Sequence, residues 1–235
     1  MKVEIWSDIL CPFCYIGKRH FGKALEKLEY ADQLEIVWKS YQLNPDSPEK
    51  VEESYSEYLA KKKNISEQQV QQMLSSVVAM AKDAGLDYHL DRTVMTNSYK
   101  AHLLIQLAKT KGLGDEMEES LFKGYFTDGK NISDVDTLVE LGASVGLSKE
   151  EVVAALADDN LAYNLKIDLD EAAQIGVTGV PFFVMNRKYG ISGAQPVEVF
   201  INSIDKAYQD WKGSQSNTII DVSQGNSCSV DGQCD

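Results

Sequence analysis

Two cysteines separated by two residues are the part of the chain best suited to chemistry. Cys11-Pro12-Phe13-Cys14 stands where a strand-like segment ends and a helical pattern begins. The nucleophile in thiol chemistry is the thiolate, and a helix N-terminus offers N–H groups and partial positive charge that stabilise an anion. Cysteines at this spacing can close a disulfide with little movement of the backbone. We therefore expect Cys11 to attack from the mouth of the helix and Cys14, inside the first turn, to resolve.

A zinc site is the alternative interpretation, but structural zinc needs a second pair of ligands. The other two cysteines, Cys228 and Cys234, are separated by five residues in a segment of small and polar residues, which is unusual spacing for zinc. We therefore expect redox chemistry and no metal. A disulfide closing so short a loop would stabilise the fold little. Cys228 and Cys234 are thus interpreted either as a second redox pair that exchanges electrons with Cys11 and Cys14 or as an incidental exposed pair.

The segments around the first cysteine pair predict an α/β fold. Apolar residues near the N-terminus predict a strand before Cys11, and Pro12 suits the first position of a helix, where its missing N–H costs nothing. A second strand, a long helical region, a hairpin and a last helix follow; their approximate ranges are 34–41, 49–175, 182–192 and 196–212. Residues 66–69 and 148–151 have the form of helix starts. We expect a thioredoxin-like domain at 1–46 and 167–212, a helical insertion at 47–166 and a flexible tail at 213–235.

Composition limits the possible partners. The chain has 235 residues, 43% hydrophobic and 25% charged, which is ordinary for a soluble globular protein. Its formal net charge of −13 repels phosphate backbones and anionic lipids, so neither nucleic acid nor a membrane is an expected partner. The N-terminus does not have the form of a secretory signal. We therefore expect a cytoplasmic protein, in which cysteines usually act chemically rather than as permanent cross-links.

The motifs in this order resemble the DsbA family of thioredoxin-fold oxidoreductases. The resemblance covers about residues 2–212 and rests on CPFCYIG after the first strand and on GVTGVPFFV before the hairpin. The strings YGISGAQ, YFTDGKNISD and NSYKAHLL are similar to the FrnE-type branch of that family. Some members of this branch carry a second, C-terminal cysteine pair. The fold implied is a thioredoxin fold with a large all-helical insertion.

The resemblance also implies an activity and its site. It implies thiol–disulfide exchange with protein or small-molecule thiols, as a reductase, an isomerase or a mild oxidant, with Cys11 attacking and Cys14 as its partner. It implies a cis peptide bond between Val180 and Pro181 facing the cysteines, with the Val180 backbone pairing with a bound substrate strand. No tightly bound cofactor is expected, and glutathione is a candidate redox partner. The apolar faces of the insertion could support a homodimer.

The sequence departs from the family pattern close to the cysteines. Phe13 stands where DsbA itself has a histidine, so the cation that would stabilise the Cys11 thiolate is missing, which implies a weaker oxidant. Ile5 stands where thioredoxin-fold enzymes often have a buried acid. Asp8 is a nearby acid. Whether it transfers protons for Cys14 is open at this point, and we expect it to be a solvated carboxylate at the end of the strand. His102 and Asn97, in the helical region, are candidates of lower rank, because a lone helical histidine is more often structural.

Two other functions remain open. Kappa-class glutathione transferases and chromene-carboxylate isomerases resemble this chain in architecture but place a serine or a lone thiol where Cys11 stands. The complete cysteine pair counts against them, and a glutathione-conjugation assay would decide. A non-enzymatic holdase chaperone would suppress aggregation even after both active-site cysteines were replaced.

Overall fold

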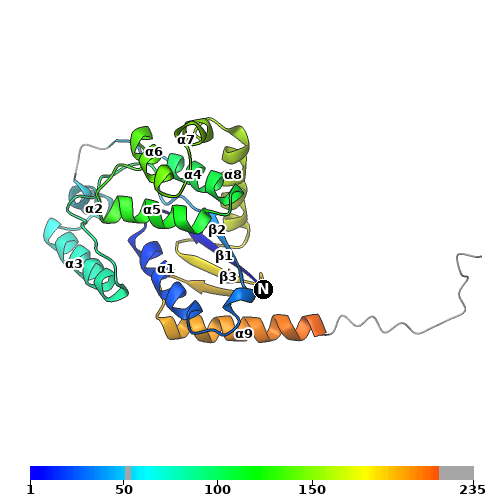
Figure 1. Ribbon diagram of the computed structural model, residues 1–235. Coiled ribbons are helices and arrows are strands. Elements are labelled where there is room, and N and C mark those ends of the chain that lie inside the picture. Colours follow the sequence, from blue (N-terminus) through cyan, green and yellow to red (C-terminus); the bar gives the residue numbers. More distant parts are fainter. Residues whose placement is uncertain (51–53, 217–235) are drawn as a thin grey trace, which may run out of the picture.

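A mixed four-stranded sheet forms the centre of the molecule (Figure 1). The computed structural model describes residues 1–50 and 54–216. The strand order is β2-β1-β3-β4, in which β1 pairs in parallel with β2 and antiparallel with β3. The strands are β1 Lys2–Ser7, β2 Glu35–Ser40, β3 Phe182–Met185 and β4 Tyr189–Ser192. The observed hairpin spans the range that the sequence predicts, 182–192, and β2 is slightly shorter than the expected range of 34–41.

Two helices cover one face of the sheet. They are α1 (Pro12–Leu25) and α9 (Val197–Ser216). Alternate residues of β1, Val3 and Ile5, point to this face and are fully buried there. Three phenylalanines pack on them, one from each of α1, β3 and α9: Phe21, Phe183 and Phe200. This packing fixes α1 against the sheet, so that the helix begins close to the end of β1.

The last helix is longer than the sequence indicates. We expected the polar tail to begin at Gly213, but α9 continues to Ser216. The Ser214 hydroxyl donates to the Trp211 carbonyl at 2.7 Å, which satisfies one acceptor in the last turn. No proline lies between Gly213 and Ser216 to stop the helix.

Helices occupy the chain between β2 and β3, as expected. They are α2 Tyr55–Lys63, α3 Glu67–Ala84, α4 Tyr99–Thr110, α5 Gly114–Phe126, α6 Val135–Ser144, α7 Lys149–Ala155 and α8 Asp159–Gln174. The helix starts predicted at Ser66 and Ser148 are present, each with a capping box, and Ser54 forms a third at the start of α2. The expected boundary at residue 166 falls inside the continuous helix α8. The division into two domains therefore stays a prediction.

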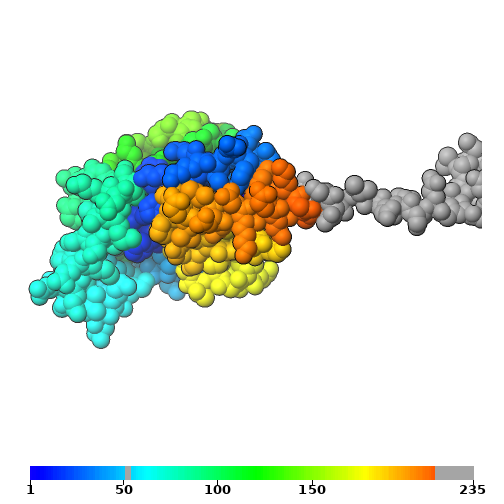
Figure 2. Space-filling model, turned by 90° about the horizontal axis from the view of Figure 1, so that it is seen from below, coloured from blue at the N-terminus to red at the C-terminus, as the bar shows by residue number. Residues whose placement is uncertain are grey.

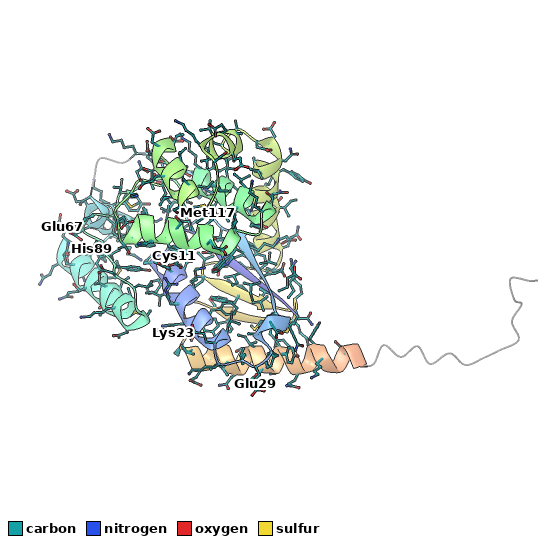
Figure 3. All side chains as sticks on the ribbon, viewed as in Figure 1. Cys11, Lys23, Glu29, Glu67, His89 and Met117 are labelled. Carbon is teal, nitrogen blue, oxygen red and sulfur yellow. The ribbon has the colours of Figure 1, made fainter. Side chains whose placement is uncertain are left out.

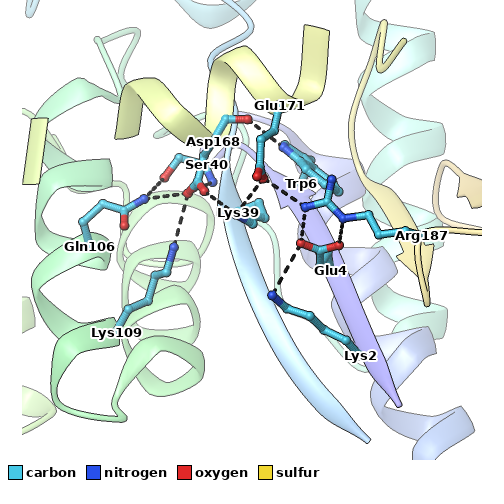
Figure 4. Close-up of polar contacts among 10 residues, drawn as sticks. All are labelled: Lys2, Glu4, Trp6, Lys39, Ser40, Gln106, Lys109, Asp168, Glu171 and Arg187. Carbon is cyan, nitrogen blue, oxygen red and sulfur yellow. Dashed lines mark hydrogen bonds and ion pairs between the residues drawn. The ribbon is translucent and has the colours of Figure 1, made fainter. Parts of the chain in front are cut away.

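A network of buried polar contacts fixes α8 and α4 to the other face of the sheet (Figure 4). At its centre, Asp168 of α8 accepts from the Ser40 N–H at 3.0 Å and from Gln106 Nε2 at 2.7 Å. Lys39 and Lys109 pair with the same carboxylate at 2.9 and 3.2 Å. Burial alone would raise the pKa of Asp168, but Lys109, the Ser40 N–H and Lys39 together lower it below its ordinary value.

The same network continues across the sheet to the hairpin. Arg187, in the turn between β3 and β4, donates to the buried Glu4 of β1 at 2.6 Å and to Glu171 of α8 at 3.1 Å. Glu171 also accepts from Lys39 at 2.8 Å. These contacts join β1, β2, α8 and the hairpin, so the part of the chain between β2 and β3 is fixed relative to the strand that leads to Cys11.

Helices α2 and α3 form one end of the molecule, coloured cyan and blue-green in Figure 2. They pack on each other, and α3 also contacts α1. Their apolar residues face the start of α1, which places them beside the candidate site. Within the described ranges, no helix is both long and apolar enough to cross a membrane.

Candidate active site

Cys11 lies at the junction of sheet and helix, as the sequence predicts. It is the residue before the first turn of α1, and Pro12 takes the first helical position. The Cys11 N–H donates to the Asp8 carbonyl at 2.9 Å, and the Cys11 carbonyl accepts from the Cys14 N–H at 3.0 Å. Figure 3 labels Cys11 where α1 meets the helical region. Within the described residues no side chain caps the start of α1, so the partial positive charge of the helix N-terminus is available to an anion at Cys11.

Cys14 lies deeper than Cys11. Its residue is 1% exposed, against 5% for Cys11, and both are free thiols in the structure. Burial raises the pKa of the Cys14 thiol well above its ordinary value, and the neighbouring Cys11 raises it further. The Asp8 backbone and the Ser7 side chain, which lie near this thiol, offset part of this effect. The two thiols are therefore chemically unequal.

The loop before β3 faces the cysteines. The Val180–Pro181 peptide bond is cis, in agreement with the expectation from the family resemblance. The Cys11 thiol donates to the Val180 carbonyl at 3.4 Å. A Cβ placed on Gly17 of α1 would lie 3.0 Å from Pro181 Cγ, so glycine permits α1 and this loop to approach closely. The structure thus places Val180 and Pro181 beside Cys11, while their role in binding substrate stays a prediction.

The expectation for Asp8 is wrong. This residue is fully buried, not solvated. Its carboxylate accepts from the Leu10 N–H at 3.2 Å and from the Leu43 N–H at 2.7 Å. The His102 ring, also fully buried, lies 3.4 Å from Asp8. The carboxylate was expected in solvent because the sequence does not reveal that the segment after β2 and helix α4 cover the end of β1.

Glu118 of α5 is a second buried acid that the sequence analysis missed. It is fully buried, and within the described part of the chain neither of its carboxylate oxygens has a hydrogen-bond partner. Burial raises the pKa of Glu118 from 4.5 to about 7, and the nearby His102 lowers this pKa by a smaller amount. The one feature of the sequence that could have indicated its burial is its place next to the apolar Met117 on an amphipathic helix. Asp8, His102 and Glu118 are thus three ionisable residues in the interior of the protein.

An apolar cavity of about 470 Å³ adjoins Cys11. Its wall includes the first turn of α1, with Phe13 38% exposed, and side chains of α2 and α3. Tyr125 of α5 also lines it, and the buried hydroxyl of that residue has no hydrogen-bond partner among the residues the structure describes. Cys11 is therefore accessible from a space large enough for part of a substrate.

Of the remaining candidates, Asn97 is described by the structure and contacts the segment after β2. Asn97 donates to the carbonyls of Pro45 and Ser47 at 3.0 and 2.6 Å, which holds the segment after β2. Cys228 and Cys234 lie outside the described residues, so their role as a second redox pair stays a prediction. In the ranges that the structure covers, no cluster of three or more histidine, cysteine or acidic side chains is arranged to hold a metal ion.

Sheet, helices and cis-proline loop together define a thioredoxin-fold protein with a dithiol at the mouth of α1. The DSBA-like thioredoxin domain family model matches residues 2–205, and the chain belongs to this family.

Known proteins agree with this assignment. The crystal structure of the probable DsbA oxidoreductase SCO1869 from Streptomyces coelicolor is 37% identical, with a TM-score of 0.86, over 100% of this chain and 98% of that one. The uncharacterized protein YwbO of Bacillus subtilis is 28% identical over 87% of this chain and 96% of its own length. The cytosolic disulfide reductase DsbM of Pseudomonas aeruginosa shares the fold, with a TM-score of 0.61 at 15% identity over 92% and 99% of the two chains.

Proposed function

We propose that this protein is a dithiol–disulfide oxidoreductase in which Cys11 attacks and Cys14 resolves. The observation that carries the proposal is the difference between the two thiols. Cys11 lies at the mouth of α1 and lines the cavity, whereas Cys14 is almost completely buried with a raised pKa. A substrate sulfur can reach Cys11 first, and Cys14 acts only within the protein.

Reduction of a substrate then takes two exchanges. The Cys11 thiolate attacks one sulfur of the substrate disulfide, a Cys11–substrate disulfide forms, and the other sulfur leaves as a thiolate. Cys14 loses its proton and attacks Cys11 Sγ, which releases the second substrate thiolate and forms the Cys11–Cys14 disulfide. Two electrons pass from the protein to the substrate, and the released thiolates take up protons according to their own acidity. The reverse sequence oxidises a dithiol, and incomplete resolution permits isomerisation.

The substrate class is thiols and disulfides of proteins or small molecules, with an extended substrate strand pairing with the backbone at Val180. Glutathione is the proposed electron donor, and the cytoplasm the proposed compartment. DsbM, which shares the fold, is described as a cytosolic disulfide reductase, and one of its structures contains glutathione. The 2-hydroxychromene-2-carboxylate isomerase also shares the fold, at 11% identity, but the complete Cys11–Cys14 pair favours exchange over that chemistry.

Insulin reduction tests the proposal. Wild-type protein should accelerate the reduction of insulin by a small thiol, and Cys11→Ser should remove the acceleration. Titration against glutathione buffers then gives the reduction potential, which separates a reductase from an oxidase. Equal activity of wild type and Cys11→Ser would contradict the proposed function.

A further inference from the structure

The cavity beside Cys11 is larger than a reacting disulfide bond requires. Its volume of about 470 Å³ is that of a site for a small molecule or a large side chain. Most of the wall is apolar and comes from three directions: Leu10 from the turn before α1, Leu59 from α2, and Met73 and Val77 from α3. Because such surfaces bind apolar groups, the part of a substrate next to its reacting sulfur is expected to be apolar.

The charged side chains that line this cavity indicate that it binds a negatively charged group. Lys62 and Lys63, at the end of α2, line it, and among the described residues that form the wall none is acidic. This is unusual in a chain with 36 acidic and 23 basic residues. The Lys62 ammonium lies 5.6 Å from the centre of the Tyr58 ring, which also lines the cavity. An anionic group that enters here meets cations at one side of an apolar space.

Tyr125 supplies a second, independent sign of a ligand. Its residue is 1% exposed, and its hydroxyl has no hydrogen-bond partner in the described structure. Buried hydroxyls are nearly always paired, because an unpaired one costs free energy. Tyr125 lines the cavity, so an acceptor atom on a bound molecule can take this hydrogen bond.

We propose that this cavity selects disulfides and thiols whose body is aromatic or aliphatic and carries a carboxylate. The proposal rests on the function proposed above and adds the substrate class to it. The apolar body lies between α2 and α3, the carboxylate faces Lys62 and Lys63, and the sulfur reaches Cys11. The electron transfer is the two-step exchange already described, with the fully reduced protein as the only reductant.

Single-turnover reduction of matched probes tests this inference. Dithiodibenzoate and its uncharged diamide have nearly the same shape and differ in the carboxylates, and hydroxyethyl disulfide is small and neutral. Each rate with reduced protein is divided by the rate of the same probe with a free thiol, which removes differences in intrinsic reactivity. We expect dithiodibenzoate to be preferred over the diamide by about fivefold, the size of effect that two partly exposed ion pairs give.

Charge variants decide whether the lysines cause the preference. The double variant Lys62→Gln/Lys63→Gln should bring the ratio of the two aromatic probes close to one. Lys82→Gln/Lys123→Gln removes the same charge from exposed positions outside the cavity and should keep the preference. The inference would be overturned if wild type reduced dithiodibenzoate and the diamide at nearly equal corrected rates. It would also be overturned if the preference for dithiodibenzoate persisted without Lys62 and Lys63.

A filling variant tests the cavity itself. Met73→Trp should slow both aromatic probes more than it slows hydroxyethyl disulfide, whereas Met80→Trp, at an exposed site on the same helix, should slow none. Equal rates of Met73→Trp and wild type with the aromatic probes would also overturn the inference. If wild type and Cys11→Ser reduce hydroxyethyl disulfide equally, the proposed function itself fails, so the two failures are distinguishable.

Discussion

Among single residues, Asp8 has a position that decides the geometry of the site. Its carboxylate bonds the backbone at Leu10 and at Leu43, so it holds the turn before Cys11 against the segment after β2. A buried carboxylate with two N–H donors is well satisfied, and loss of an acceptor there leaves an N–H group unpaired. Asp8 is therefore best understood as a positioning residue for Cys11.

We expect Asp8→Asn to destabilise the protein by about 1–3 kcal/mol, because an amide has one acceptor oxygen for two N–H donors. The displaced turn should also slow the alkylation of Cys11. Urea unfolding and the alkylation rate with iodoacetamide measure the two effects. Asp83→Asn, at an exposed position of α3, is the matched control and should change neither. Unfolding of Asp8→Asn at the wild-type urea concentration would show that the two bonds do not matter.

Residue-scale prediction succeeded where chemistry is local and failed where burial comes from distant elements. The spacing of Cys11 and Cys14 at a strand–helix junction was enough to place both thiols at the start of α1. Asp8 was expected in solvent and is buried by residues more than thirty positions away. Glu118 gave no signal that distinguishes it from the many solvated acids on amphipathic helices, since only tertiary packing removes it from water.

At the scale of elements, helix α5 places the acidic residue Glu118 in the interior of the protein. Glu118 faces His102 and Lys109 of α4, Lys18 of α1 and Asp115 of its own helix. The folded protein holds the Glu118 proton more tightly than the unfolded chain does, because burial raises its pKa to about 7. This group therefore makes the free energy of unfolding fall as pH rises from about 4.5 to about 7.

Glu118→Gln should remove that dependence. At pH 8 the variant should be more stable than wild type, by up to about 3 kcal/mol if the whole pKa shift is realised, and near pH 4 the difference should vanish. Urea unfolding at several pH values measures it. Glu116→Gln, exposed on the same helix, should follow the wild-type profile. A Glu118→Gln variant less stable than wild type at pH 8 would mean that the ionised carboxylate is compensated by its neighbours.

The elements themselves were more predictable than their extents. The capping boxes at Ser66 and Ser148 are local signals that survive in the structure, because a cap is formed within four residues. The limits of the second strand, the continuity of α8 past residue 166 and the last turn of α9 depend on packing and were not set by local sequence. The network around Asp168, which fixes α8 to the sheet, joins this residue to others more than 120 positions away and could not be foreseen.

At the scale of the whole molecule, the sheet and the helical region meet at the active-site turn. The cysteines come from β1–α1, the cis-proline loop from the segment before β3, and the cavity from α1, α2, α3 and α5. The ion pairs of Glu4, Lys39, Asp168 and Arg187 join β1, β2 and the hairpin to one another and to α8 of the helical region. The site is therefore built jointly by both parts of the chain.

The distant cysteine pair is the remaining prediction at this scale. If Cys228 and Cys234 relay electrons, Cys228→Ser/Cys234→Ser should slow steady-state turnover with a protein disulfide several-fold. The melting temperature and the single-turnover rate with hydroxyethyl disulfide should not change, because so short a loop contributes little stability. Ser227→Ala/Ser229→Ala, on either side of Cys228, is the control. Unchanged turnover in the cysteine variant would leave the pair incidental.

Trapping the mixed disulfide tests the order of attack most directly. In the Cys228→Ser/Cys234→Ser background, Cys14→Ser should form a stable one-to-one disulfide with a substrate peptide, which peptide mapping by mass spectrometry locates at Cys11. Cys11→Ser in the same background should form almost none, because Cys14 is buried and its thiol is held protonated. An adduct found at Cys14 in the Cys11→Ser variant, at a yield equal to that at Cys11, would contradict the assignment of Cys11 as the attacking thiol.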